Sequence, residues 1–147
     1  MESAAFFSDY PRVVRELICG VSGTSPYLKS LIDTERLWLN AALSDPEKAI
    51  KAATASVINR GKLAAELRLA KRRVALWIAL CDLSGIWTLE QCTETLSDFA
   101  DLAVKNALRL GVRRQAEQGK IPGFGPDDDL DMVGIFVLAM GKMGARE

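Results

Sequence analysis

The chain has 147 residues, its 19 Lys and Arg balance its 19 Asp and Glu, and it contains no histidine. This length provides for one core, or for one domain and the edge of another. A neutral chain lacks the overall basic charge of general nucleic-acid binders, so we expect no nucleic-acid partner. Without histidine, Ser–His and Cys–His nucleophilic catalysis and His-based metal sites are excluded from these residues.

The sequence carries no sign of export or membrane insertion. No apolar run approaches the roughly 18–20 residues of a membrane span. The first residues lack the basic and long apolar regions of a secretory signal. Cys19, Cys81 and Cys92 lie in apolar helical patterns, and their odd number argues against a disulfide framework. We therefore expect a cytoplasmic protein with three buried, reduced thiols and no membrane partner.

Capping residues followed by proline predict three helices in the first part of the chain. Ser8–Asp9, Ser25 and Asp45 are the predicted caps. The predicted ends are Gly20 for the first helix, Ser44 for the second and Gly61 for the third, with a loop over residues 21–25.

Two longer helices are predicted next. Apolar residues at helical spacing, from Leu63 to Cys81, mark the buried stripe of a helix over residues 62–83. Thr88 and Gln91 form a capping-box pattern at the start of a second helix. That helix could continue to about residue 118, which gives it a length on the order of 45 Å at 1.5 Å per residue.

The pattern changes after the fifth helix. Pro122, Pro126 and an acidic run favour a linker over residues 119–131. The apolar run Gly134–Met140 is bounded by glycine and rich in Val, Ile and Phe, which predicts a buried strand. A glycine-marked turn, Gly141–Gly144, follows it.

These patterns predict an all-α fold, a helical bundle of about five helices, followed by the start of a second domain. The expected boundaries are residues 1–118 for the helical domain, 119–131 for the linker and 132–147 for the first strand and turn of the second domain. A buried strand needs partners on both edges, and no residue after Glu147 supplies them. We therefore expect this chain to be a fragment of a longer protein.

Two charged clusters are candidates for function. The helix over residues 62–83 carries four basic residues, Arg68, Lys71, Arg72 and Arg73. They could bind phosphate or nucleic acid, but a solvated helix face paired with Glu66 or Asp82 is favoured, and the better functional interpretation is a contact with an adjoining domain. The acidic run of residues 127–129, with Asp131, lacks the ligand spacing of an EF-hand loop, so a solvated linker is favoured over a metal site.

The three tryptophans are interpreted as packing residues. Trp38 and Trp77 lie in apolar helical stripes, which favours the core over stacking on a ligand. Trp87 lies in a loop, and we expect it to pack as a cap on the core.

The segment Gly134–Lys142 invites comparison with a phosphate-binding P-loop. Six residues separate its two glycines where the P-loop has four, and Met143 lacks the hydroxyl that holds Mg²⁺. A turn of backbone N–H groups at the start of a helix could still bind phosphate, so the turn Gly141–Gly144 stays a candidate.

Several stretches resemble one known family. Val137–Glu147 resembles the opening of the nucleotidyltransferase domain in the bacterial bifunctional glutamine synthetase adenylyltransferase/adenylyl-removing enzymes, where a strand leads into Gly-Lys-Leu-Gly-Gly-x-Glu-Leu. Glu66–Gly85 and Leu96–Asp101 resemble the helical stretch that precedes the first catalytic domain, and Ser25–Leu28 resembles an earlier helical region. The likeness follows the order of the family over nearly the whole chain.

The resemblance implies a polymerase-β-like nucleotidyltransferase fold for the second domain, and roles for four residues. Gly144 and Ala145 fall where that fold places a Gly-Gly or Gly-Ser pair behind the nucleotide phosphates, and Ala145 departs from the pattern by one methyl group. Lys142 and Arg146 are candidate phosphate neighbours by proximity. The Asp-x-Asp that holds Mg²⁺ in this superfamily would follow Glu147, so the resemblance places no catalytic and no metal-binding residue in this chain.

The resemblance also implies the activity of the parent enzyme. It attaches AMP from ATP to a tyrosine of glutamine synthetase and removes it by phosphorolysis, under the control of a PII-type signal protein and glutamine. Helices that lead into the first nucleotidyltransferase domain indicate the adenylyl-removing half. Mg²⁺ and ATP or phosphate would serve the parent, and we expect none of them bound to this chain and no activity from it alone.

Two alternatives stay open. One is a stand-alone helical interaction module, with residues 132–140 as a last helix, and the other is a different polymerase-β-like nucleotidyltransferase. The truncated edge has a consequence of its own, because an apolar strand without its sheet needs another partner. We expect residues 134–140 to be helical, disordered or paired with a second copy, so self-association through this edge is a further prediction.

Overall fold

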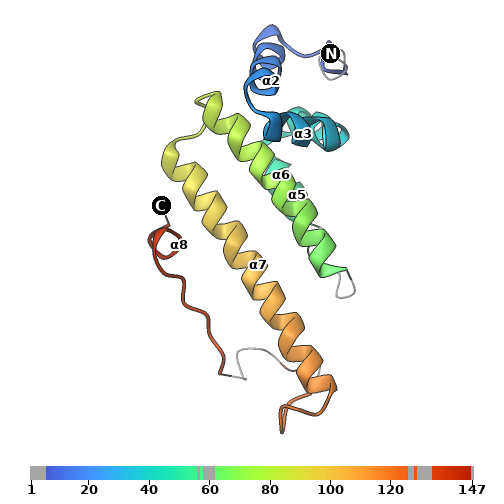
Figure 1. The fold of residues 1–147 in the computed structure, drawn as a ribbon, viewed down its shortest axis with the longest axis vertical. Coiled ribbons are helices and arrows are strands. Elements are labelled where there is room, and N and C mark those ends of the chain that lie inside the picture. The colour runs from blue at the N-terminus through green and yellow to red at the C-terminus, as the bar shows by residue number, and fades with distance from the viewer. Residues whose placement is uncertain (1–5, 56, 58–61, 126–127, 129–133, 147) are drawn as a thin grey trace.

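The computed structural model describes residues 6–55, 57, 62–125, 128 and 134–146. Within these ranges the regular structure is entirely helical, which confirms the predicted all-α class. The framework is an antiparallel pair of long helices, α6 (Leu63–Leu83) and α7 (Leu89–Glu117), and shorter helices pack around one end of the pair (Figure 1).

The first helices are α2 (Arg12–Thr24) and α3 (Pro26–Thr34), joined at Ser25. The Ser25 cap is confirmed, because its Oγ accepts a hydrogen bond from the Leu28 N–H at 3.2 Å. The predicted caps Ser8 and Asp9 are wrong, since Pro11 precedes the first helical residue and no side chain caps this end.

The predicted stop at Gly20 and the loop over residues 21–25 are also wrong. The helix continues through Gly20 to Thr24, and this places Val21 in the core with 4% of its surface exposed. Burial of a valine is worth about 1.5–3 kcal/mol, which exceeds the cost of about 1 kcal/mol for a glycine inside a helix.

The second predicted helix is two helices. After α3 the chain bends at Glu35, and α4 (Arg36–Ser44) begins directly after it. Glu35 keeps both backbone hydrogen bonds: its N–H donates to Leu31 O at 2.9 Å, and its carbonyl oxygen accepts from Leu39 N–H at 2.8 Å. The bend therefore leaves no buried backbone group unpaired at this residue.

The third predicted helix is represented by a 3₁₀ turn, η1 (Pro46–Lys48), and by α5 (Ala49–Thr54). Its predicted end near Gly61 lies outside the described residues. Asp45 does not cap the backbone as predicted. Its carboxylate instead accepts a hydrogen bond from the Lys48 ammonium at 2.7 Å, and this bond lowers the pKa of Asp45.

The two long helices and the capping box between them are confirmed. Thr88 Oγ1 accepts from the Gln91 N–H at 3.3 Å, and Gln91 Oε1 accepts from the Thr88 N–H at 2.9 Å. More of α6 is buried than predicted, because α3, α4, α5 and α7 all pack against it. Leu76 and Leu80 therefore join the predicted stripe in the core.

The tryptophans pack as predicted. The rings of Trp38 and Trp77 meet edge to face with their centroids 6.5 Å apart, and Trp87 packs against the core from the α6–α7 turn. Of the cysteines, Cys81 and Cys92 are buried, but Cys19 is exposed. The prediction of a third buried thiol is wrong because α2 turns Ile18 and Val21 toward the core and leaves Cys19 outside it.

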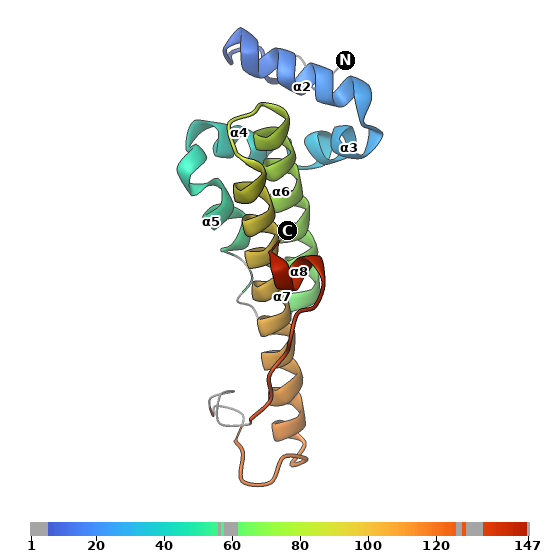
Figure 2. The ribbon, with the colours of Figure 1, turned by 90° about the vertical axis from the view of Figure 1, so that its left-hand side faces the viewer.

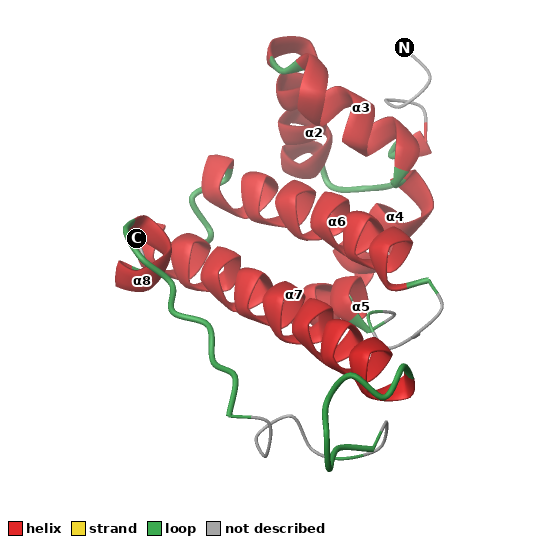
Figure 3. Cartoon of the chain, turned by 60° about the horizontal axis from the view of Figure 1, so that its bottom comes forward, coloured by secondary structure: helices red, strands yellow, loops and turns green. Residues whose placement is uncertain are grey.

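The last described segment is irregular until the short helix α8 (Lys142–Ala145) and returns alongside α7 (Figures 2 and 3). The predicted buried strand is wrong within the described residues, since Ile135–Met140 form neither a strand nor the alternative helix. A strand needs a hydrogen-bonded neighbour, and here the side chains of Phe136, Leu138 and Met140 are 78%, 76% and 87% exposed. Among the helices of the described ranges, none combines the length and the apolar character required to cross a bilayer.

Candidate functional site

The residues predicted to face nucleotide phosphates form a tight turn that opens on Gly141. Gly141 has φ 68° and ψ −143°, a backbone conformation that is open to glycine and strained for other residues. The chain then makes the single helical turn α8, in which the Ala145 N–H donates to Gly141 O at 3.0 Å. This amide is therefore used within the turn and is not free for a phosphate oxygen.

Gly144 is required by a close approach of the backbone. A Cβ atom at this position would lie 2.5 Å from Ala139 O, well inside van der Waals contact, so even alanine would displace the chain. A side chain on Ala145, one residue later, points out to solvent. The structure thus accommodates the departure at Ala145 from the Gly-Gly pattern, whereas it demands glycine at Gly144.

The two basic residues of the turn differ in their surroundings. Lys142 is exposed and forms no ion pair with any described residue. Arg146, which has φ 60°, places its guanidinium on two carboxylates of α7: it pairs with Asp98, and its Nη1 lies 3.9 Å from Asp101 Oδ2. The arginine expected beside phosphate is therefore bound to acidic groups here, and this contact docks the turn against α7.

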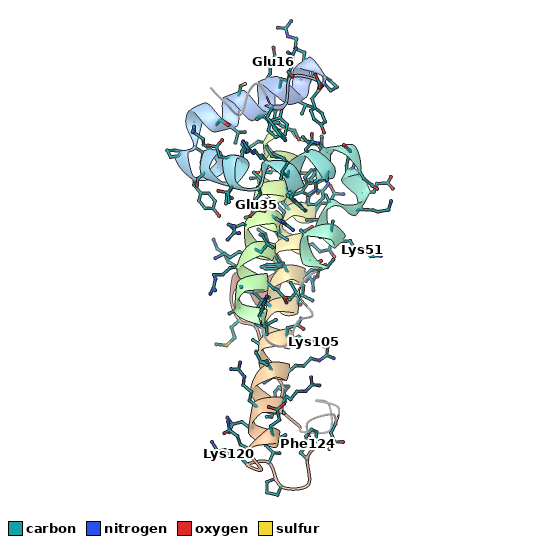
Figure 4. The ribbon with its side chains drawn as sticks, turned by 90° about the vertical axis from the view of Figure 1, so that its right-hand side faces the viewer. Glu16, Glu35, Lys51, Lys105, Lys120 and Phe124 are labelled. Carbon is teal, nitrogen blue, oxygen red and sulfur yellow. The ribbon has the colours of Figure 1, made fainter. Side chains whose placement is uncertain are left out.

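The four basic residues of α6 divide into two pairs. Arg72 Nε and Arg73 Nε each donate to Glu35, to Oε1 and to Oε2, both at 2.9 Å. Glu35 is 5% exposed and lies where α3 and α4 meet α6 (Figure 4). The predicted partners Glu66 and Asp82 are thus replaced, for Arg72 and Arg73, by a carboxylate 37 and 38 residues away.

Both oxygens of Glu35 are satisfied by charged donors, which is what a buried carboxylate needs. Arg73 also lies over the Trp38 ring, 5.6 Å from its centroid. Through these contacts Arg72 and Arg73 join α6 to the bend between α3 and α4. Arg68 and Lys71 are exposed and form no ion pair with a described residue, so they are the members of the cluster that face outward.

The structure does not bring the two candidate clusters together. The turn at Gly141–Arg146 lies against α7, while the Glu35 contacts lie on the side of α6 that faces α3 and α4 (Figure 1). Of the predicted acidic run, only Asp128 is described, and its carboxylate accepts the Gly125 N–H at 2.6 Å. Across the described ranges, no three His, Cys, Asp or Glu side chains gather as a metal site requires.

Three residues of these clusters were missed in the sequence. Glu35 was not singled out, because its partners Arg72 and Arg73 lie 37 and 38 residues away in the sequence. Asp98 and Asp101 are three residues apart, which puts two carboxylates on one helix face, but nothing local identifies Arg146 as their partner.

Comparison with known proteins assigns this helical pair and the glycine turn to one family. A family model described as glutamate-ammonia ligase adenylyltransferase matches residues 13–147. The chain belongs to this family. The match covers every helix from α2 onward except the first residue of α2, and it includes the whole turn at Gly141–Arg146.

Individual adenylyltransferase relatives agree with the family match. The chain is 38% identical over 143 residues to a "bifunctional glutamine synthetase adenylyltransferase/adenylyl-removing enzyme" from Rhodopseudomonas palustris strain HaA2. It is 38% identical over 141 residues to the protein of the same name from Bradyrhizobium sp. strain BTAi1, and 33% identical over 142 residues to that from Xanthobacter autotrophicus strain Py2.

These alignments cover 90–92% of this chain but 14% of each relative. The chain therefore spans about one seventh of the length of the adenylyltransferases it matches. No solved structure matches the chain.

Proposed function

We propose that this chain is the helical region that leads into a nucleotidyltransferase domain of an enzyme that adenylylates and deadenylylates glutamine synthetase. The observation that carries the proposal is the match of residues 13–147 to the adenylyltransferase family, joined to relatives whose names state both activities. In this proposal α2–α7 form the lead-in, residues 119–131 the linker, and residues 132–147 the opening of the catalytic domain.

The proposal extends to the partners and cofactors of the whole enzyme. It transfers AMP from ATP to a tyrosine of glutamine synthetase, removes it with phosphate, uses Mg²⁺, responds to a PII-type signal protein, and works in the cytoplasm. The chain belongs to the adenylyl-removing half. The position of the helices ahead of the glycine turn supports this assignment.

The glycine turn is the part of the chain that contacts nucleotide in this proposal. Gly144 lets the turn close against Ala139 O, so its role in this proposal is to allow the tight turn that presents Lys142. Lys142 is exposed and unpaired among the described residues, so its ammonium is available to a phosphate oxygen, whereas Arg146 would first have to leave Asp98.

The chain alone is proposed to be inactive. Adenylyl transfer needs carboxylates that hold Mg²⁺, and no suitable group of three ligands is present among the described residues, so we assign no step through Mg²⁺ to them. Arg68 and Lys71 are proposed to contact an adjoining domain, because both are exposed on α6 and carry no ion pair with described residues.

The first test is the reading frame beyond Glu147. We expect Ser-Asp-x-Asp within about a dozen residues, because this motif supplies the metal-binding carboxylates. A stop codon directly after Glu147 would favour the stand-alone interaction module instead.

The second test is activity. The 147-residue chain and the full product of its reading frame are assayed in parallel for transfer of labelled AMP to glutamine synthetase and for its release by phosphate, with the Rhodopseudomonas palustris relative as positive control. We expect turnover from the full product alone. Metal-dependent turnover by the 147-residue chain would contradict the proposed inactivity, and a full product that ignores glutamine synthetase would contradict the proposed substrate.

A further inference from the structure

A cavity of about 780 Å³ opens between α2, the end of α4, η1–α5, α6 and α7. Trp77, Trp87 and Phe99 supply aromatic surface, and aliphatic side chains of α2 and α6 supply most of the rest. Small-molecule sites in proteins have volumes of about 300–1,000 Å³ and mostly apolar walls with a few polar groups. The cavity therefore has the size and the lining of a ligand site, and its polar groups determine which ligand it fits.

The charged residues on the walls have one sign. Glu47 and Asp98 line the cavity, and among the described residues neither a lysine nor an arginine lines it. The thiol of Cys81 adds no charge at neutral pH, because burial raises its pKa to about 11. A nucleotide or another phosphate compound would find no cation on the described walls, so these walls do not favour a nucleotide.

The hydroxyl groups on the walls can only accept hydrogen bonds. Ser84 Oγ donates its proton to Cys81 O at 3.1 Å, Thr54 Oγ1 to Ile50 O at 3.1 Å, and Thr95 Oγ1 to Gln91 O at 2.7 Å. Each hydroxyl has one proton, which is already donated to a backbone carbonyl. Its lone pairs can therefore only accept a hydrogen bond from a ligand.

The remaining side-chain donors on the described walls are the indole N–H groups of Trp77 and Trp87 and the weakly donating thiol of Cys81. The Trp77 nitrogen is buried beneath the surface and out of contact with the cavity. Carboxylates and hydroxyls that already donate their protons make up most of the described polar groups on the walls, so these polar groups are mainly acceptors. It also lies beside the carboxyl end of α6, where the helix dipole favours positive charge.

One wall residue already binds a cation of this kind. Asp98 holds the guanidinium of Arg146, which approaches from outside the cavity. The apolar and aromatic floor would bury the body of a ligand while its charged group stays at the acidic rim, and aromatic rings add attraction for cations.

We propose that this cavity is a binding site for an amphipathic monocation, a small molecule with an aromatic or aliphatic body and one ammonium or guanidinium group. Asp98 and Glu47 bind the cation, and Trp87 and Phe99 pack on the apolar body. The inference rests on the lining of the cavity and not on the proposed enzymatic function.

A matched series of probes tests the sign of the charge. 4-Phenylbutylamine, 4-phenylbutan-1-ol and 4-phenylbutyrate share one apolar body and differ in the polar group. Each is titrated into the 147-residue chain and followed by tryptophan fluorescence and calorimetry. We expect the amine to bind about three- to fivefold more tightly than the alcohol, as exposed carboxylates allow, and the acid to bind most weakly. Equal affinities, tighter binding of the acid, or no saturable binding would overturn the proposal.

Variants locate the site. Asp98→Asn should reduce the preference for amine over alcohol, while Asp101→Asn, which removes the other carboxylate near Arg146 but lies outside the cavity, should leave it unchanged. Arg146→Ala should strengthen amine binding, because Asp98 loses its competing cation.

A second pair of variants introduces a lysine, one at the cavity and one outside it. Ile86→Lys should weaken amine binding, and Leu89→Lys, at a similarly exposed position that does not line the cavity, should not. All five substituted positions are exposed, so the variants should keep the fold, which circular dichroism checks. Equal effects of the two members of either pair would show that the amine binds elsewhere and would overturn the proposal.

Discussion

At the scale of single residues, Glu35 joins the bend between α3 and α4 to α6. It is 5% exposed, and it accepts hydrogen bonds from two guanidinium groups of α6. A buried ion pair of this kind contributes little over an apolar replacement, but removing one member leaves the other charges without partners. The ion pair therefore fixes where the bend between α3 and α4 sits on α6.

Replacement of Glu35 tests this role. Glu35→Ala should lower the free energy of unfolding by about 2–4 kcal/mol, because Arg72 and Arg73 would keep their charges and lose their acceptor. Urea unfolding followed by circular dichroism measures the change.

Glu16→Ala is the matched control. Glu16 also pairs with an arginine, Arg12 Nε at 2.7 Å, but on an exposed surface, so its loss should cost at most about 1 kcal/mol. Similar losses for Glu35→Ala and Glu16→Ala would mean that burial of Glu35 adds nothing to the ion pair.

The thiol of Cys81 predicts a dependence of stability on pH. Burial, with a smaller effect of Cys92, raises the pKa of Cys81 from 9.0 to about 11. Between these values the unfolded chain loses this proton while the folded chain keeps it, so ionisation stabilises the unfolded state. Stability should be unaffected by this group below pH 9 and should fall from pH 9 toward 11.

Urea midpoints at pH 8, 9, 10 and 10.5 for the wild type and for Cys81→Ala measure that contribution. The decline should be shallower in Cys81→Ala, while Cys19→Ala, at the exposed cysteine, should follow the wild type. Parallel curves for the wild type and Cys81→Ala would contradict the raised pKa.

At the scale of helices, the capping box at the start of α7 gives the clearest test. Thr88→Ala removes the acceptor for the Gln91 N–H and should cost about 1 kcal/mol in unfolding free energy. Thr93→Ala is its control, since the Thr93 hydroxyl donates to Glu90 O inside the same helix and caps nothing. Thermal unfolding of both variants measures the difference, and a loss in Thr93→Ala as large as that in Thr88→Ala would argue against the cap.

The sequence was sufficient to predict elements whose determinants are local. The Ser25 cap, the Thr88–Gln91 box and both long helices depend on residues within a few positions of one another, and the structure confirms them. The helix through Gly20 was missed because burial of Val21 against other helices decides it, and the bend at Glu35 because its side chain is fixed by α6.

In the candidate site, too, local features could be predicted and contacts between distant residues could not. Gly141 and Gly144 were recognised as the glycines of a turn, and the role of Gly144 followed from the family resemblance; the structure explains both glycines through backbone geometry. The position of Arg146 on Asp98 could not be predicted, because the contact joins residues 48 apart and no pattern pairs them. The cavity could not be predicted either, because segments distant in the sequence build it together.

At the scale of the whole molecule, the run Ile135–Met140 is an unusual surface. Its side chains are between 49% and 87% exposed where the structure gives a value, and such contiguous apolar surface marks an interaction site or a tendency to associate. We expect the chain to self-associate with rising concentration in sedimentation velocity experiments.

The double variant Phe136→Ser/Leu138→Ser should shift this association to higher concentration, because it removes two of the most exposed apolar side chains of the run. Leu37→Ser, at a Leu of α4 that is 74% exposed outside the run, is the control and should behave as the wild type. A monomer at every concentration would contradict self-association.

The length of α7 also has a hydrodynamic consequence. With 29 residues it measures about 43 Å, against about 31 Å for the 21 residues of α6, and it extends beyond the other helices while α2 lies across the pair (Figure 2). A particle of this form rotates faster about its long axis than end over end. Since amide N–H bonds point along a helix axis, the ratio of longitudinal to transverse ¹⁵N relaxation times should be higher in α6 and α7 than in α2, without any difference in their internal rigidity.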